Sequence, residues 1–275
     1  MEKGKNIIIY YESLRTFIIY KEILEEKPFI FDTVIKMPFL PYSRKSNKRN
    51  YKKLIITSIE NPGYFIIQFL NIYIYNLISF IFKTRLEDIC RNKKINHIYF
   101  EKFDSEFLKF IKGKNPNYIV NTTSSLIPID LLNIPKIGVI NLHEAPLPEY
   151  RGSALYFWLL FNKEKKAHVT CHYVQEELDA GDIICTGPSV KISKNNTIFF
   201  LWKSLLLSYK NLWPKIIEYL ITNKRLESYK QNNNRAKTYS YPNRKVSNYL
   251  KNNNIKIISF KDIKFLLKVA ITGNL

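Results

Sequence analysis

Short apolar runs alternate with stretches of helical spacing through the first half of the chain. In the runs, β-branched and aromatic side chains follow one another without a break, as in buried strands. In the longer stretches, apolar side chains recur every three or four residues, and Asp104 is placed as the N-cap of one of them. The predicted strands are KNIIIYY, HIYF, PNYIVNTT and GVINLH, and the predicted helices are LRTFIIYKEILEEK and DSEFLKFIKGK. Such alternation is typical of an α/β fold with a mostly parallel sheet flanked by helices.

The pattern changes near Asn195. From there FFLWKSLLLSYKNLWPKIIEYLI has helical spacing, and an Asn-rich link, QNNNRAK, leads into a tail of mixed pattern. At 275 residues the chain is long enough for one large domain with a small addition. We therefore expect an α/β domain over residues 1–195 and a helical and mixed C-terminal appendage over residues 196–275.

Polar side chains stand at the end of one predicted strand. In GVINLHEAPLPEYRG, Gly138 to Gly152, the apolar run stops at Asn141 and reaches His143 two residues later. Residues two apart in a strand point to the same face, so these two side chains are predicted to be neighbours. Ligands of open α/β sheets bind at the carboxyl ends of strands. An amide and an imidazole there form either a cap or a catalytic pair.

Two further segments carry candidate chemistry. HVTCH alternates, so that His168, Thr170 and His172 are predicted to share one face of a strand. The neighbouring sequence offers no compact set of further ligands, and we expect no metal site. EELDAGDII, Glu176 to Ile184, has the composition of an acidic turn followed by a strand.

Composition and charge narrow the class of protein further. The chain is 46% hydrophobic, which excludes a disordered protein, and it carries 43 Lys+Arg against 23 Asp+Glu, a net charge of +20. A basic balance suits nucleic acid, anionic lipid or phosphorylated substrates, but joint over-use of Lys, Asn, Ile, Tyr and Phe favours compositional drift. Three cysteines without a CxxC pair exclude a disulfide framework, and the N-terminus lacks a signal-peptide pattern. We expect a cytoplasmic location.

One apolar segment leaves that location open to membrane association. YFIIQFLNIYIYNLISFIF, Tyr64 to Phe82, approaches the ~20 residues that span a bilayer, but Gln68, Asn71 and Asn76 interrupt it on one helical face. It is a helix buried in the fold or at a homodimer interface, a helix on a membrane surface, or a span. We favour the first, with the three amides facing solvent or polar partners. The preceding basic run, Ser43 to Lys53, is predicted to be a solvated loop that could also meet lipid head groups.

The order of these motifs resembles the central signature of the folate-dependent formyltransferases. In that family an Asn-x-His-Pro-Ser-Leu-Leu-Pro-x-Tyr-x-Gly loop precedes a Thr-x-His strand and a Leu-Asp-x-Gly turn. Here NLHEAPLPEYRG precedes AHVTCHYVQEELDAGDII, with Glu144 and Ala145 where Pro-Ser is usual. The resemblance covers Ile95 to Ser193. It implies a Rossmann-like formyltransferase fold and a cis Leu147–Pro148 bond.

The resemblance also implies the site and its chemistry. Asn141, His143 and Asp179 match the family's catalytic Asn, His and Asp. The loop Val120 to Pro128 and the segment Gln175 to Asp179 match the walls of its pterin pocket, which makes the expected cofactor-binding residues Ser125, Ile127, Gln175 and Glu177. The co-substrate implied is N10-formyltetrahydrofolate.

The chain's size bears on the acceptor amine. Methionyl-tRNA formyltransferase suits the +20 charge but carries a sizeable C-terminal barrel domain, and the purine enzyme is normally smaller. The layout best fits a sugar N-formyltransferase, with an amino-sugar nucleotide as substrate for surface polysaccharide synthesis and no nucleic-acid partner. A methionyl-tRNA formyltransferase-like enzyme acting on another amine, or a non-catalytic folate-binding relative, is the alternative.

Overall fold

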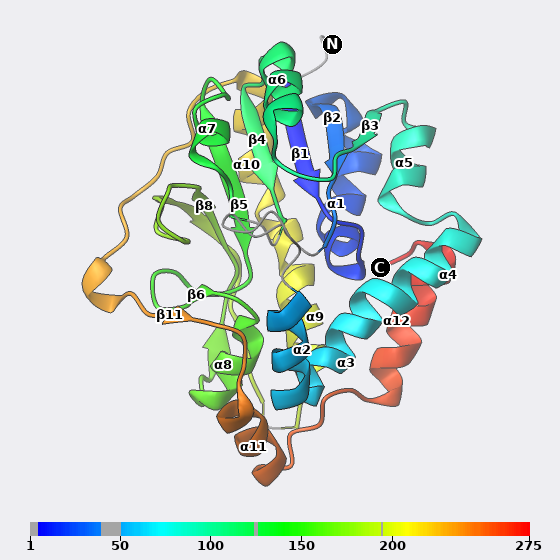
Figure 1. The fold of residues 1–275 in the computed structure, drawn as a ribbon, viewed down its shortest axis with the longest axis vertical. Helices are drawn as coiled ribbons and strands as arrows, with labels where there is room; N and C mark the ends of the chain where they lie inside the picture. Colours follow the sequence, from blue (N-terminus) through cyan, green and yellow to red (C-terminus); the bar gives the residue numbers. More distant parts are fainter. Residues whose placement is uncertain (1–4, 40–50, 124–125, 194) are drawn as a thin grey trace.

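A seven-stranded sheet forms the centre of the molecule (Figure 1). The structure is a computed structural model that describes residues 5–39, 51–123, 126–193 and 195–275. The strand order is β3-β2-β1-β4-β5-β8-β9. The first five strands are parallel, β8 pairs antiparallel with β5, and β9 pairs antiparallel with β8. The strands are β1 (Asn6–Tyr10), β2 (Phe31–Lys36), β3 (Asn96–Tyr99), β4 (Tyr118–Asn121), β5 (Gly138–His143), β8 (Thr170–Tyr173) and β9 (Ile183–Thr186). The predicted mostly parallel α/β fold is confirmed.

Helices cover both faces of this sheet (Figure 1). Side chains of α1, α9 and α10 belong to one core cluster with the sheet, and side chains of α6 and α7 belong to a second cluster. Asp104 caps α6 as predicted, because its carboxylate accepts a hydrogen bond from the Phe107 amide at 3.0 Å. The helices of this part are α1 (Leu14–Glu26), α5 (Leu86–Asn92), α6 (Ser105–Lys114), α7 (Ile129–Leu132), α8 (Leu155–Phe161), α9 (Ile198–Ser208) and α10 (Trp213–Thr222), with short 3₁₀ turns η1 (Pro28–Ile30), η3 (Tyr209–Asn211) and η4 (Asn233–Arg235).

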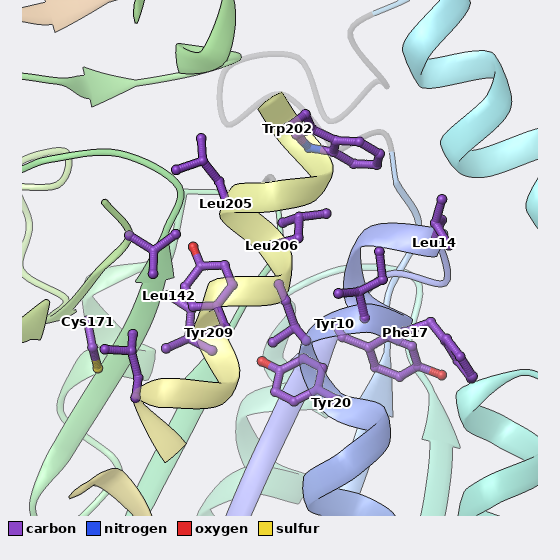
Figure 2. Close-up of a cluster of buried hydrophobic side chains, with 14 of the residues drawn as sticks. Tyr10, Leu14, Phe17, Tyr20, Leu142, Cys171, Trp202, Leu205, Leu206 and Tyr209 are labelled. Atoms are coloured by element: carbon purple, nitrogen blue, oxygen red, sulfur yellow. The ribbon is translucent and has the colours of Figure 1, made fainter. Parts of the chain in front are cut away.

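The strand pleat divides the core between the two faces. In β1, Ile7 and Ile9 pack in the cluster of α6 and α7, whereas Ile8 and Tyr10 pack in the cluster of α1 and α9. Figure 2 shows the larger cluster, in which side chains of α9 meet side chains of α1 beside the strands. Both faces of β1 are therefore buried, which explains its continuous apolar run.

One central strand was absent from the sequence prediction. β2 has the sequence FDTVIK, and polar Asp32 and Thr33 interrupt its apolar run. Thr33 is fully buried all the same, and its hydroxyl donates to the Asp32 carboxylate at 2.7 Å. HVTCH also differs from expectation, because β8 begins at Thr170 and His168 lies before the strand.

The apolar segment forms a nearly continuous helix after α2 (Tyr51–Glu60). It consists of α3 (Pro62–Gln68), a π-helical stretch η2 (Phe69–Ile74) and α4 (Tyr75–Phe82). The prediction that its amides meet polar partners is confirmed, since Asn71 Oδ1 accepts from the Arg15 amide at 2.9 Å and Asn76 Nδ2 donates to the Glu12 carbonyl at 3.1 Å. The opposite side of the helix is exposed within the described chain. The fold itself therefore covers one side of the segment, and coverage of the other side by a twofold partner stays a prediction.

The C-terminal segments return to the α/β body. α11 (Arg244–Asn252) packs on α8, and α12 (Phe260–Thr272) packs on α4. Two short strand pairs complete the structure: β6 (Arg151–Gly152) with β11 (Thr238–Tyr239), and β7 (Lys166–Ala167) with β10 (Val190–Lys191). Val246 and Val269 belong to the same core cluster as β1 and α1. A domain boundary at residues 195 and 196 stays a prediction.

Candidate active site

A cavity of about 210 Å³ opens at the carboxyl ends of β4 and β5. This is the edge at which ligands of parallel α/β sheets bind. Segments that are far apart in the sequence converge on it, from β1 to the chain beyond α10. The residues that line it include Tyr11, Arg15, Tyr64, Gln68, Asn71, Asn121, Leu126, Ile127, Asn141, His143, Glu144, Gly152, Tyr156, His172, Gln175, Glu176, Leu178, Asp179 and Tyr241. The predicted trio Asn141, His143 and Asp179 thus shares one cavity.

The pleat of β5 brings Asn141 and His143 to one face, as predicted. Opposite Asn141, on the antiparallel strand β8, lies His172. The Asn141 Nδ2 is 3.2 Å from His172 Nε2, and His172 Nδ1 is 2.8 Å from the Tyr173 carbonyl oxygen. A carbonyl only accepts, so His172 carries its proton on Nδ1 and Nε2 accepts from the amide. Burial lowers the pKa of His172 to about 4, which keeps it neutral.

His143 has the opposite arrangement. Its Nε2 lies 2.6 Å from the carbonyl oxygen of Tyr150 and therefore donates a hydrogen bond. Nδ1 faces the Asp179 Oδ2 at 3.6 Å and carries no hydrogen in the neutral form of the ring. A proton taken up at Nδ1 would lie beside the carboxylate. His143 is buried, with 6% of its surface exposed, so the carboxylate is its nearest compensating charge.

Asp179 is held by the chain around it. Its backbone φ is +51°, and its Oδ2 accepts from the Gly152 amide at 2.9 Å. Its Oδ1 lies 3.7 Å from His172 Nε2, so the carboxylate stands between the two histidines. The Gln231 side chain donates to the Asp179 carbonyl at 2.8 Å. The expected appendage therefore contributes directly to the site.

The loop after β5 folds back as the resemblance implied. The Leu147–Pro148 bond is cis, which confirms that prediction. The Thr170 hydroxyl donates to the Ala145 carbonyl at 2.8 Å, which ties the loop to β8. At the end of the loop, Arg151 is 3% exposed and donates to Glu177 at 2.8 Å and to Gln231 at 2.9 Å.

The expected cofactor-binding residues are spread over the cavity mouth. Ile127 and Gln175 line the cavity, and Ser125 lies outside the described residues. The Glu177 carboxylate pairs with Arg151, and among the described residues it is the neighbouring Glu176 that lines the cavity. Two apolar side chains that the sequence did not single out, Leu126 and Leu178, also line it and are 54% and 42% exposed.

A partly buried ion pair occupies another part of the cavity wall. The Arg15 Nε contacts the Glu144 carboxylate, and Arg15 Nη1 donates to the Thr122 carbonyl at 2.8 Å. Burial alone would lower the pKa of Arg15, but the Glu144 carboxylate raises it above its ordinary value. Tyr11 and Gln68 line the same cavity. Glu144 stands where the resembled family has proline, and nothing in the sequence near Arg15 indicated this contact.

Three ligand-type atoms in the site lie close together. One atom each of His143, His172 and Asp179 lies within 4.8 Å of the other two. Two imidazoles and a carboxylate are a set that binds divalent metals such as Zn²⁺. The His172 Nε2 and the Asp179 Oδ2 already accept hydrogen bonds from Asn141 and Gly152. A metal-free site stays a prediction.

Comparison with known proteins agrees with the geometry. Residues 88–215 match the formyl transferase family model. The methionyl-tRNA formyltransferase of Clostridioides difficile (strain 630) is 45% identical over 82 residues, which are 30% of this chain and 26% of that protein. The chain spans between 26% and 50% of the length of the curated relatives it matches.

Solved structures share the fold at low sequence identity. An N-formyltransferase from Helicobacter canadensis, solved with folinic acid and dTDP-3-aminofucose, superposes with a TM-score of 0.54 at 19% identity over 86% of this chain and 71% of that chain. Glycinamide ribonucleotide transformylase 1 from Symbiobacterium toebii superposes with a TM-score of 0.56 at 13% identity, over 83% of this chain and 95% of that chain.

The protein is an α/β protein with the formyltransferase fold and a polar cluster at the carboxyl edge of its sheet. The matched segment contains β5, β8 and the whole Asn141, His143 and Asp179 cluster. Over this segment, just under half of its length, the chain is similar to the formyl transferase family.

Proposed function

We propose that the protein transfers a formyl group from N10-formyltetrahydrofolate to the amino group of an amino sugar carried on a nucleotide. The observation that carries this proposal is the meeting of Asn141, His143 and Asp179 in one cavity within the family segment. Their side chains supply an amide donor, a proton acceptor and an anion, which are the groups that acyl transfer to an amine requires.

In the reaction, the acceptor nitrogen attacks the formyl carbon and a new carbon–nitrogen bond forms. The carbonyl oxygen then carries negative charge, and the second Asn141 Nδ2 hydrogen, which His172 does not use, can donate to it. His143 Nδ1 takes the proton that the amine loses, and Asp179 stabilises the resulting imidazolium. The bond between the carbon and N10 breaks, and the proton passes to N10. The products are a formamide and tetrahydrofolate.

The folate would lie between the loop after β4 and the segment before Asp179. Ile127 gives this part of the cavity an apolar floor, and Leu126 and Leu178 flank its mouth. Flat aromatic rings bind well between apolar side chains, with a few polar groups to fix their orientation. Gln175 is such a group here, and Ser125 and Glu177 remain proposed contacts of the same ligand.

The sugar acceptor is supported by the fold neighbour from Helicobacter canadensis, which was solved with dTDP-3-aminofucose. The polar wall of Tyr11, Arg15, Gln68 and Glu144 suits a ligand rich in hydroxyl groups. A second candidate acceptor is charged initiator tRNA, because the curated relatives are named methionyl-tRNA formyltransferase and the chain carries +20. In either case we propose a cytoplasmic reaction.

The test is a formyl-transfer assay with N10-formyltetrahydrofolate, a panel of amino-sugar nucleotides and charged initiator tRNA. We expect a formamide product with an amino-sugar nucleotide. His143→Asn and Asp179→Asn should each lower kcat by at least about 10²-fold, because each removes one part of the proton-transfer pair. Thermal unfolding and folate binding close to wild type would show that the variants are folded.

If charged initiator tRNA were formylated and no amino-sugar nucleotide were, the acceptor would be the tRNA and not the sugar. Near-normal turnover in either variant would refute the assigned roles. Folate binding without any product across the panel would favour a non-catalytic relative.

A further inference from the structure

We propose that the outer face of the α3–η2–α4 helix, together with the exposed stripe of α12, docks on the surface of an anionic membrane. The outer face consists of Phe65, Phe69, Tyr73, Leu77, Phe80, Ile81 and Phe82, and the α12 stripe of Phe260, Ile263, Leu267 and Ile271. The two are adjacent because α12 packs against α4, as Figure 1 shows.

The outer face is large and apolar for a surface in contact with water. Tyr73, Leu77 and Phe80 are 56%, 62% and 63% exposed, and Phe260 on α12 is 80% exposed. The Phe65, Phe69 and Tyr73 rings stack in sequence, with centroids 5.9 and 5.6 Å apart. Contiguous apolar patches of this kind mark interaction sites, since single exposed side chains are common but rows of them are rare.

The inner face of the same helix fixes its orientation. Asn71 is buried and bonded to the Arg15 amide, and Asn76 donates to the Glu12 carbonyl. The sequence's few amides therefore face the protein, and its apolar side chains face outward. By length and composition Pro62–Asn92 could cross a membrane, with 28% of its most apolar window buried. A span would break the Asn71 and Asn76 contacts, whereas a helix lying on the surface keeps them.

Charge around the outer face identifies the occupant. Residues 61–82 contain no charged side chain, and the exposed charges next to the two stripes include Lys83, Lys261, Lys264 and Lys268. The acids of adjoining helices are half-buried or buried, namely Glu60, Glu87, Asp88 and Asp262. A twofold dimer through this face would bring the same lysines together, because an isologous contact pairs a patch with itself. Anionic lipid instead attracts each lysine by about 1 kcal/mol.

Docking on a membrane would also place the cavity close to the lipid. Tyr64, Gln68 and Asn71 line the cavity from the inner side of the helix whose outer side carries Phe65 and Phe69. A helix with its side chains is about 10 Å across, so the cavity wall would lie about that far from the head groups. The acceptor amine would then be received at the membrane surface.

The experiment is flotation of the full chain with vesicles of phosphatidylcholine alone, or of phosphatidylcholine and phosphatidylglycerol in equal parts, at low and high salt. We expect flotation with the mixed vesicles at low salt and release as salt rises. The variant F69S/Y73S/L77S/F80S should bind at least about tenfold less, because it removes exposed apolar area that docking on the membrane would bury. K83E/K261E/K264E should lose the preference for anionic vesicles. The matched control, Y99S/I221S, changes two other exposed apolar side chains and should float like wild type.

Circular dichroism melting shows whether each variant is folded, so loss of binding by a folded variant supports docking. Absence of flotation, or flotation that the serine variant does not weaken, would overturn the proposal. So would a wild-type dimer on sizing that the serine variant converts to a monomer without any vesicle binding. Vesicle binding needs neither folate nor acceptor, so its failure would leave the proposed formyl transfer untouched.

Discussion

His143 and His172 flank the same carboxylate, yet their hydrogen bonds give them different chemistry. His172 donates through Nδ1 and presents a lone pair to the Asn141 amide, and burial lowers its pKa to about 4. His143 donates through Nε2 and presents Nδ1 to Asp179. One imidazole is therefore a fixed acceptor that orients an amide, and the other is open to a proton.

Asn141→Ala tests the oxyanion contact at this scale. Loss of the Nδ2 donor should lower kcat by about 10²–10³-fold while folate binding is kept, because the contact strengthens only as charge develops on oxygen. Rapid-mixing turnover and folate titration would measure the two effects. Asn96→Ala changes a strand asparagine of β3 that does not line the cavity and serves as the control. A change in folate affinity with normal kcat would contradict the role.

Sequence reasoning could find part of this site. The two-residue period of β5 was sufficient to pair Asn141 with His143, because a strand pleat is a local property. The catalytic role of Asp179 was predicted only from the resemblance, because the composition of its segment indicates no more than an acidic turn. Gln231 and Arg15 are 52 and 129 residues from their partners Asp179 and Glu144, and no local pattern specifies such contacts.

At the scale of elements, the short β6–β11 pair holds Asp179 in place. Gly152 in β6 has φ +111°, and a Cβ there would meet the Tyr239 carbonyl oxygen at 1.9 Å. The same glycine donates its amide hydrogen to Asp179. Glycine is therefore required both by the backbone conformation and by the closeness of β11.

Gly152→Ala should separate β6 from β11 and move the amide away from Asp179. We expect a loss of roughly 1–3 kcal/mol in unfolding free energy from the backbone strain, with the clash adding to it, and a fall in kcat. Urea unfolding and the transfer assay would measure both. In Gly113→Ala of α6, the added Cβ meets nothing within 4 Å, so that control should be neutral or more stable by up to about 1 kcal/mol. Equal stability of the two variants would contradict the interpretation.

The sequence predicted elements best where the pattern was long and uniform. β1, α1, α6 and α9 follow from apolar runs or helical spacing. β2 was missed because two polar residues interrupt a short strand, one of them bonded to the other and thus satisfied in the core. The partners of α11 and α12 could not be foreseen, because tertiary packing and not propensity decides them.

For the whole molecule, a carboxyl at the end of β1 links several elements and makes stability depend on pH. The Glu12 carboxylate accepts hydrogen bonds from the Tyr10 hydroxyl at 2.9 Å and from the Leu86 amide, the first of α5, at 3.4 Å. The backbone carbonyl of Glu12 accepts from Asn76 Nδ2. Burial raises the pKa of Glu12 to about 7. The folded state therefore holds a proton that the unfolded state, with an ordinary pKa, releases near pH 4.5.

Because the folded pKa is the higher one, this contribution is fully present below about pH 4.5 and is lost as pH rises through about 7. Glu12→Gln mimics the protonated acid, so it should gain stability relative to wild type as pH rises. The gain should be no more than about 3 kcal/mol. Urea unfolding from pH 4.5 to 8 would measure the difference, with the exposed Glu106→Gln as control. A difference independent of pH would contradict the assignment.

The π-helical stretch η2 has a consequence for sequence alignment. The exposed Phe65, Phe69, Tyr73 and Leu77 and the buried Ile67, Asn71, Tyr75 and Ser79 are all spaced by four residues. This spacing exceeds the 3.6 residues of an α turn, and the wider π turn keeps both rows in line. A relative with one residue fewer between Phe69 and Ile74 could form a regular α-helix and keep the same two faces, because eleven residues at about 100° each end only about 20° beyond three full turns. A one-residue gap in an alignment at this place would therefore leave the same rows of side chains facing the cavity and the outside, whereas an ungapped alignment would shift every later residue of the helix by one position.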